Sequence, residues 1–159
     1  MASRNEAERR KVDASYLEAA ALCHATEECS RVEESVRRIF PPELREAVEL
    51  ETAHMDGYYG NPISVITARL NNSEQVHLTL KHVSEALDPL EKAILRTTFD
   101  MRYDHKSKKL VVRFSKQDLY LGKLKIHDSD DVVKVIIGLK NARSASDAIN
   151  FFSLCGLLS

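Results

Sequence analysis

The run from Val132 to Leu139 constrains the fold most, because it is the most strongly β-prone stretch of the chain. We expect it to form a central strand of a sheet. Alternation of apolar and polar residues predicts most of the other strands, since successive side chains of a strand point to opposite faces. The apolar run at 16–25 fits a strand or a helix by periodicity alone, and we interpret it as a strand. The predicted strands cover residues 16–25, 48–55, 63–70, 99–103, 109–114, 123–126 and 132–139.

Helical signals fill segments between these strands. Thr26 is the expected N-cap of a helix whose apolar residues, from Cys29 to Phe40, share one face. A capping box at 72–75 predicts a second helix, and the sequence at 88–91, a carboxylate cap followed by proline, predicts a third. From Ser144 onward the spacing indicates a short apolar helix.

The order of these elements predicts an α+β fold with two layers, in which helices pack on one face of a mostly antiparallel sheet. No repeat and no linker divides the chain. We therefore expect one domain at 14–143, preceded by a flexible charged tail at 1–13 and followed by an apolar C-terminal helix at 144–159.

Composition narrows the cellular setting. The chain of 159 residues is 43% apolar, which is enough for one ordinary core, and no apolar run approaches the roughly 18 residues of a membrane span. The first residues are charged, unlike a secretory signal. We expect a soluble cytoplasmic protein that makes no membrane contact and keeps its three cysteines as reduced thiols.

The sequence contains no recognisable catalytic or metal-binding pattern. Cys23, His24 and Cys29 have the wrong spacing for a zinc site, and the acidic turn at 128–131 lacks the glycine and the final glutamate of a calcium loop. Glycine-rich phosphate loops and the nucleophile motif of hydrolases are missing too. We therefore expect no enzymatic activity, no cofactor and no metal. A metal-dependent nuclease built on the carboxylates of that acidic turn is the weakest alternative.

Charge is distributed unevenly along the chain. Residues 1–91 hold 10 Lys/Arg and 17 Asp/Glu, whereas residues 92–144 hold 13 and 6, although the formal net charge of the chain is −1. If the late strands are neighbours, they and the turn between them place cations on one exposed face, at a spacing that suits successive phosphates of RNA. These cations are Arg102, Lys106, Lys108, Lys109, Arg113, Lys123, Lys125 and Lys134. An ordinary solvated surface is the alternative interpretation of the same charges.

Three tyrosines are the aromatic residues that we expect to stack on bases or ribose, namely Tyr58, Tyr59 and Tyr120. The alternative for each is packing in the core with a hydrogen-bonded hydroxyl.

Three separated motifs follow one another in the chain: Gly57-Tyr58-Tyr59-Gly60-Asn61-Pro62-Ile63, the segment 114–124, and the segment 130–135. The second contains a Lys-Gln-x-x-Tyr-Leu-Gly signature formed by Lys116, Gln117, Tyr120, Leu121 and Gly122. Together they resemble an archaeal family of small RNA-binding proteins, also regarded as predicted exosome subunits, over roughly Tyr16 to Lys140. The resemblance implies a fold similar to that of a ribosomal protein that holds 5S ribosomal RNA, and it brings no catalytic residues.

Our leading hypothesis is a non-catalytic RNA-binding protein that acts in RNA processing or ribosome biogenesis, in association with the exosome. Lys116 and Gln117, at the start of a short helix, would hold one phosphate with a cation and backbone N–H groups. Asn61 either reads a base edge or holds its own turn. The expected partners are structured RNA, either ribosomal or a processing substrate, and proteins of the exosome or ribosome.

The alternative is a protein-interaction subunit that docks on an RNA-processing or ribosomal assembly without direct affinity for RNA. It would use its acidic helices or its C-terminal tail. Both tails lie outside the family likeness, so they offer a surface for an added partner or for a homodimer.

Overall fold

The computed structural model describes residues 11–57 and 60–158 of the chain. Within this part, six strands form one sheet in the order β2-β3-β1-β6-β5-β4, and all neighbouring strands are antiparallel. The strands are β1 (Asp13–His24), β2 (Leu50–Asp56), β3 (Pro62–Leu70), β4 (Tyr103–Asp104), β5 (Lys109–Ser115) and β6 (Val132–Lys140). The central strand predicted at 132–139 is confirmed as β6, between β1 and β5. Most of the predicted tail at 1–13 lies outside the described residues.

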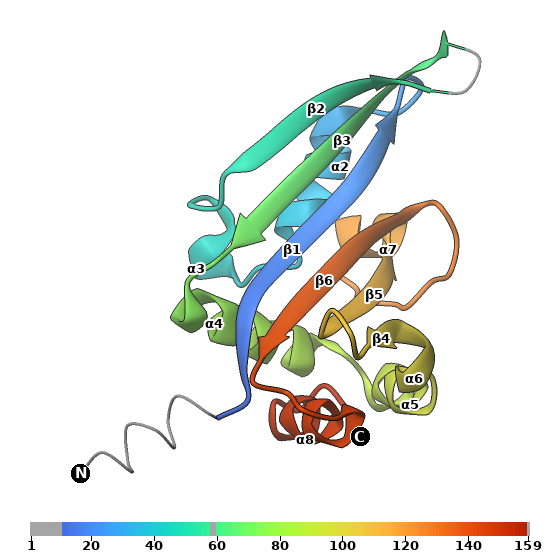
Figure 1. Ribbon diagram of the computed structural model, residues 1–159. Coiled ribbons are helices and arrows are strands. Elements are labelled where there is room, and N and C mark those ends of the chain that lie inside the picture. The colour runs from blue at the N-terminus through green and yellow to red at the C-terminus, as the bar shows by residue number, and fades with distance from the viewer. Residues whose placement is uncertain (1–10, 58–59, 159) are drawn as a thin grey trace.

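The helices lie behind the sheet and at its lower end in Figure 1, which leaves the opposite face of the sheet bare. This arrangement confirms the predicted two-layer α+β fold. None of the helices in the described ranges is long and apolar enough to cross a membrane. The helices are α2 (Cys29–Arg37), α3 (Pro42–Arg45), α4 (Ser73–Ala86), α5 (Pro89–Thr97), α6 (Phe99–Arg102), α7 (Lys116–Tyr120) and α8 (Ala145–Leu154).

Two of the predicted helix starts are confirmed in atomic detail. The side chain of Asn72 accepts a hydrogen bond of 3.1 Å from the backbone N–H of Gln75, and α4 begins at the next residue, Ser73. The carboxylate of Asp88 accepts a hydrogen bond of 3.0 Å from the backbone N–H of Glu91, and α5 begins at Pro89, the residue after Asp88. Each cap satisfies a backbone donor that would have no partner within its helix.

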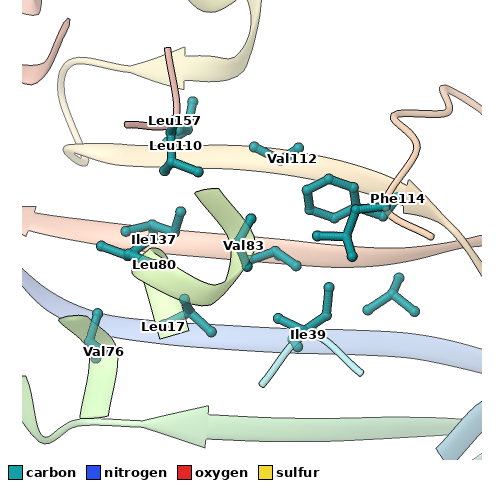
Figure 2. Packing of buried hydrophobic residues seen from close by; sticks show 14 of the residues in the cluster. Leu17, Ile39, Val76, Leu80, Val83, Leu110, Val112, Phe114, Ile137 and Leu157 are labelled. Carbon is teal, nitrogen blue, oxygen red and sulfur yellow. The ribbon is translucent and has the colours of Figure 1, made fainter. Parts of the chain in front are cut away.

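The core lies between the covered face of the sheet and the helices. Leu17 of β1, Leu110 of β5 and Ile137 of β6 are all buried, and they pack with Leu80 and Val83 of α4 (Figure 2). Most of their neighbours along the strands are half-buried or exposed, and the side chains of these neighbours point to the other face of the sheet.

Helix α8 closes one end of this core. Phe152 is fully buried, with its ring centroid 6.1 Å from that of Phe99 in α6. Leu157 and Leu158, which follow α8, are buried as well. The apolar side chains of the C-terminal tail therefore pack within their own domain, whereas Leu154 on the outer side of α8 is 81% exposed.

The strand predicted at 99–103 is wrong for most of its length. Residues 99–102 form α6, and only Tyr103 and Asp104 pair with β5. Phe99 and Tyr103 are four residues apart, and their rings stack with centroids 5.2 Å apart, while Met101 is 87% exposed. The apolar residues of this segment fit both the two-residue repeat of a strand and the four-residue spacing of a helix. Packing of Phe99 against Phe152 favours the helix.

Two predictions about the segment after β1 are also wrong. The helix starts at Cys29 rather than after Thr26, and Glu28 is its N-cap. Cys23 and Cys29 are not reduced thiols: they form a disulfide with a Cα–Cα distance of 5.7 Å. The turn at 24–28 brings the end of β1 back beside the start of α2, which the spacing of the cysteines in the sequence could not show.

Cys155 is the free cysteine of the described chain. Burial raises the pKa of its thiol to about 11, so this cysteine stays protonated at neutral pH.

We expect Phe152→Ala to lower the free energy of unfolding by about 3–5 kcal/mol, because it leaves a cavity beneath α6 and α8. Leu154→Ala, which changes an exposed side chain of the same helix, should change the free energy by less than about 0.5 kcal/mol. Urea denaturation of both variants measures the difference. Equal effects would mean that α8 does not close the core.

Candidate RNA interface

The bare face of the sheet carries cations from β5 and β6. Arg113 of β5 lies directly opposite Lys134 of β6, and Lys109 of β5 lies opposite Gly138. Cross-strand partners point to the same face, and the residues that alternate with these cations on β5, Leu110, Val112 and Phe114, are buried on the helix side. The structure thus brings these three predicted cations together on one face.

Lys125 joins them through a short extension of the sheet. The predicted strand at 123–126 is reduced to a single bridge between Ile126 and Phe114. The backbone N–H of Ser115 donates to the carbonyl of Lys125 at 2.8 Å, which places Lys125 beside the end of β5. The buried carboxylate of Glu91 fixes this segment, because it accepts a 3.0 Å hydrogen bond from the backbone N–H of Ile126. We call Lys109, Arg113, Lys125 and Lys134 the basic face.

The turn between β4 and β5 places two further cations, Lys106 and Lys108, at the end of this hairpin. The carboxylate of Asp104 accepts hydrogen bonds from the Ser107 hydroxyl at 2.7 Å and from the backbone N–H of Lys106 at 3.1 Å. These hydrogen bonds lower the pKa of Asp104, and the one from Ser107 contributes most. Asp104 thus holds the turn and also puts one carboxylate at the margin of the basic face. Lys123 is exposed in the turn after α7.

Arg102 does not contribute to the basic face, although the sequence predicts that it does. Its side chain is 8% exposed and donates to both carboxylate oxygens of Asp128, at 3.1 and 3.3 Å. The hydrogen bonds from Arg102 lower the pKa of Asp128. Both charges are therefore used within the fold, and Arg102 has little surface to offer a phosphate.

The acidic turn at 128–131 was the basis of the nuclease alternative. Two of its three carboxylates have cationic partners, since Asp128 pairs with Arg102 and Asp131 with Lys116. Among the described residues, no group of three or more His, Cys, Asp or Glu side chains could hold a metal ion.

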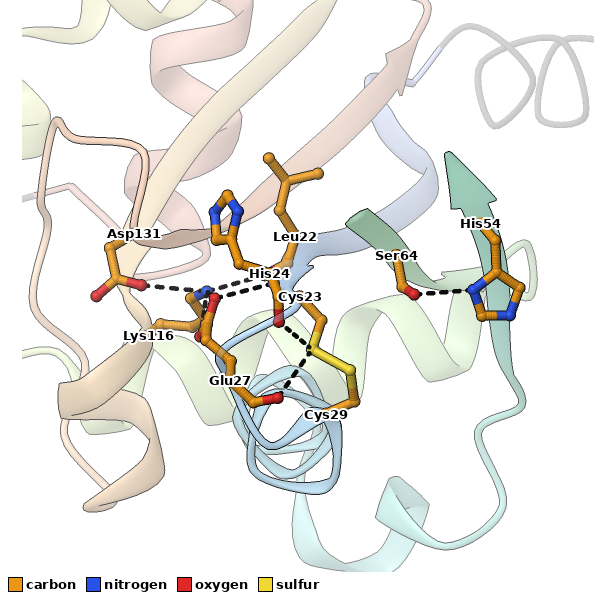
Figure 3. The surroundings of a disulfide bond; sticks show 9 residues. All are labelled: Leu22, Cys23, His24, Glu27, Cys29, His54, Ser64, Lys116 and Asp131. Atoms are coloured by element: carbon orange, nitrogen blue, oxygen red, sulfur yellow. Dashed lines mark hydrogen bonds and ion pairs between the residues drawn. A yellow bond between two sulfur atoms is a disulfide. The ribbon is translucent and has the colours of Figure 1, made fainter. Parts of the chain in front are cut away.

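Lys116 lies inside the protein, so the prediction that it meets a phosphate is wrong. Its side chain is 4% exposed. The Nζ atom donates to the carbonyl of Leu22 at 2.8 Å and to the carboxylate of Glu27 at 2.9 Å, and it lies 3.1 Å from a carboxylate oxygen of Asp131 (Figure 3). An ammonium group has three donors, and three protein groups surround this one.

The Lys116 ammonium ties together four segments: the end of β1, the turn at 24–28, α7 and the loop before β6. The Cys23–Cys29 disulfide closes the same turn a few residues away (Figure 3). The carbonyl of Lys116 also accepts a 2.9 Å hydrogen bond from the hydroxyl of Ser35 in α2. The lysine of the signature therefore has a structural task that its local sequence could not reveal, because Glu27 and Leu22 lie 89 and 94 residues away.

The rest of the signature faces a different part of the surface. Gln117 and Tyr120 line a hollow of about 610 Å³ between α2 and α7. The amide of Gln117 donates to Asp131 at 3.3 Å, and the guanidinium of Arg31 lies 5.5 Å from the centre of the Tyr120 ring. Gly122 ends α7 with a φ of 84°, a conformation that suits glycine. Gln117 and Tyr120 are thus not part of the basic face.

The remaining predicted residues lie between β2 and β3 in the sequence. Tyr58 and Tyr59 lie outside the described residues. Asn61 is exposed at the tip of this hairpin, where its carbonyl accepts a 2.7 Å hydrogen bond from the backbone N–H of Gly57. In the sheet, β1 separates this hairpin from β6, and Asn61 lies past the last pair between β3 and β1, His24 with Ile63, so Asn61 does not join the basic face.

Two residues of the bare face were missed by the sequence analysis. The ring of Tyr16 lies 6.0 Å from the ammonium of Lys109, and the guanidinium of Arg69 lies over the same ring at 4.2 Å. One signal was present in the sequence: Gly138 interrupts the most β-prone strand, and an isolated glycine in a strand often marks a close approach of another group.

We expect Lys116→Met to lower the free energy of unfolding by about 2–3 kcal/mol, because it leaves Glu27, Asp131 and the Leu22 carbonyl without their common donor. Lys123→Met, at an exposed site on the same segment, should change it by less than about 0.5 kcal/mol. Thermal and urea denaturation measure both. A Lys116→Met protein as stable as the wild type would show that the cluster has no structural role.

Comparison with known proteins shows which family this chain matches. Residues 16–139 match the family described as RNA binding. A protein of Pyrococcus abyssi named as an RNA-binding protein is 29% identical over 140 residues, covering 87% of this chain and 90% of that protein. An uncharacterised protein of Methanocaldococcus jannaschii is 29% identical over 125 residues, covering 78% of this chain and 83% of that one.

A solved structure supports the fold independently. The crystal structure of a DUF54 protein from Archaeglobus fulgidus superposes with a TM-score of 0.77 at 24% identity, over 90% of this chain and 99% of that one. The family match covers most of the sheet and the helices that pack on it, from the start of β1 to the end of β6. The chain belongs to the RNA-binding family.

Proposed function

We propose that this protein is a non-catalytic RNA-binding module and that the basic face of its sheet contacts the phosphates of the RNA. Membership of the RNA-binding family and the name of the Pyrococcus abyssi relative support RNA as the ligand. The bare face supports the location, because it is the side of the sheet without helices and carries cations on adjacent strands (Figure 1).

The observation that carries the proposal is the pair formed by Arg113 and Lys134. Like charges directly opposite each other on adjacent strands are destabilising. Among the described residues, no carboxylate lies within ion-pair distance of either of them. Asp128 also attracts Arg113, which contributes to the lowered pKa of Asp128, but this carboxylate is already paired with Arg102. Phosphate groups of RNA would relieve the repulsion between Arg113 and Lys134.

The cellular role belongs to the same proposal. We place the protein in RNA processing or ribosome biogenesis, in association with the exosome or with ribosomal proteins, and this step depends on the resemblance of the three sequence motifs. Purification of the tagged protein with and without nuclease treatment tests it. Loss of exosome or ribosomal proteins after nuclease treatment would indicate contact through RNA, and their absence in both samples would contradict the assignment.

Lys134→Glu separates binding from stability. The new carboxylate lies opposite Arg113, so we expect the free energy of unfolding to stay the same or rise by about 0.2–1 kcal/mol. The affinity for RNA should fall, because a phosphate contact becomes a repulsion. Fluorescence anisotropy with a labelled RNA and urea denaturation measure the two quantities on the same protein.

The matched control is Arg96→Glu, which changes the net charge equally at an exposed position of α5 outside the basic face. It should leave the affinity close to that of the wild type. For the wild type, contacts to about five phosphates predict a slope of about −3.5 in a plot of log affinity against log salt concentration for single strands. Equal losses in the two variants, or no binding by the wild type, would refute the proposed interface.

A further inference from the structure

Tyr16 lies on the bare face because it alternates with the buried Leu17 of β1, and an irregularity of the strand lies directly before it. Ala14 pairs with Leu139 of β6 and Tyr16 pairs with Gly138, so that Ser15 is an extra residue between two consecutive pairs. The hydroxyl of Ser15 donates to the carbonyl of Gly138 at 3.1 Å and holds this bulge. The extra residue interrupts the alternation, so that Ala14 before the bulge and Leu17 after it are both buried.

Gly138 provides the space for the tyrosine ring. A Cβ atom at position 138 would collide with three atoms of that ring. The ring therefore lies directly against the backbone of β6, in the cross-strand row that continues to Lys109 of β5. Tyr16 thus connects the middle of the sheet to the basic face.

Arg69 covers the outer side of this ring. Its Cζ atom lies 4.2 Å from the ring centroid, and its Nε donates a 3.1 Å hydrogen bond to the side chain of Asn71. The arginine is nevertheless exposed. The guanidinium is a planar cation, held on one side by an aromatic ring and along one edge by an amide, so part of its surface stays open to solvent.

The charge around Arg69 differs from that around Arg113. Glu18 of β1 lies directly opposite Arg69 of β3, whereas a cation lies opposite Arg113. A neighbouring carboxylate weakens the attraction for phosphate, but it does not prevent stacking on the guanidinium plane. Arg69 is therefore suited to a flat neutral group, and the basic face nearby is suited to the charged backbone that carries it.

We propose that Arg69, backed by Tyr16, is a stacking site for one unpaired nucleobase, and that the ligand of the bare face is consequently single-stranded RNA. This inference rests on the proposed function, since the phosphates on either side of that base are held by the basic face. A base in a duplex is stacked and paired, and does not reach a flat site in the middle of a sheet. Nucleobases commonly stack on aromatic rings and on arginine in single-strand binders.

The experiment uses the full chain and a 12-nucleotide oligouridine with one central 2-aminopurine, whose fluorescence falls when it stacks. A 12-base-pair RNA duplex is the comparison ligand. We expect the wild type to quench the probe and to bind the single strand more tightly than the duplex. Arg69→Lys keeps the charge but loses the plane, so it should weaken single-strand binding by at least about fivefold, with little change in the salt dependence.

Three variants control for folding and for charge. Tyr16→Phe keeps the ring and should bind like the wild type, whereas Tyr16→Leu should lose binding to the same extent as Arg69→Lys. Arg96→Lys, at an exposed position of α5 outside the basic face, should have no effect. The stacking site would be overturned if Arg69→Lys and Tyr16→Leu kept the salt-dependent binding of the wild type, or if the wild type preferred the duplex. Either result would leave the proposed function standing. Failure of the wild type to bind either RNA would overturn both.

Discussion

The register between β1 and β6 decides what each face of the sheet carries. Leu17 pairs with Ile137 and Ala19 with Val135, which directs these residues under the helices and leaves Lys134 on the bare face. A slip of one residue would exchange the two sets and bury a lysine in an apolar layer, where an unpaired charge is very costly. The hydrophobic core therefore specifies the position of the basic face, although none of its own side chains would contact RNA.

The cations of the late segments have two different physical roles. Lys116 and Arg102 are almost fully buried, and their charges are matched by carboxylates that hold separate segments together. Lys109 and Lys134 are exposed and have no ion-pair partner in the described part of the chain. Charge counting treats these residues alike. Burial and pairing distinguish those that stabilise the fold from those that remain available to a polyanion.

Much of the fold could be predicted from the sequence because its strands and caps are local signals, as at β6 and at the Asn72 cap. The failures depend on tertiary packing or on the path of the chain in a turn, which local signals do not show. Phe99 forms a helix because Phe152 packs on it, and the Cys23–Cys29 disulfide depends on how the chain turns after β1. For the site, alternation correctly grouped cations of β5 and β6. It could not identify the acid partners of Lys116, or the contacts of the Tyr16 ring with Gly138 and Arg69.

The central claim is that RNA lies on the bare face of the sheet. Lysine acetylation with and without bound single-stranded RNA, followed by mass spectrometry, tests it directly because lysines occur on both sides of the molecule. We predict protection of Lys109, Lys125 and Lys134, with the exposed Lys81 of α4, the helix that packs behind β1, modified equally in both states. Protection of Lys81, with the lysines of the basic face unchanged, would contradict the claim.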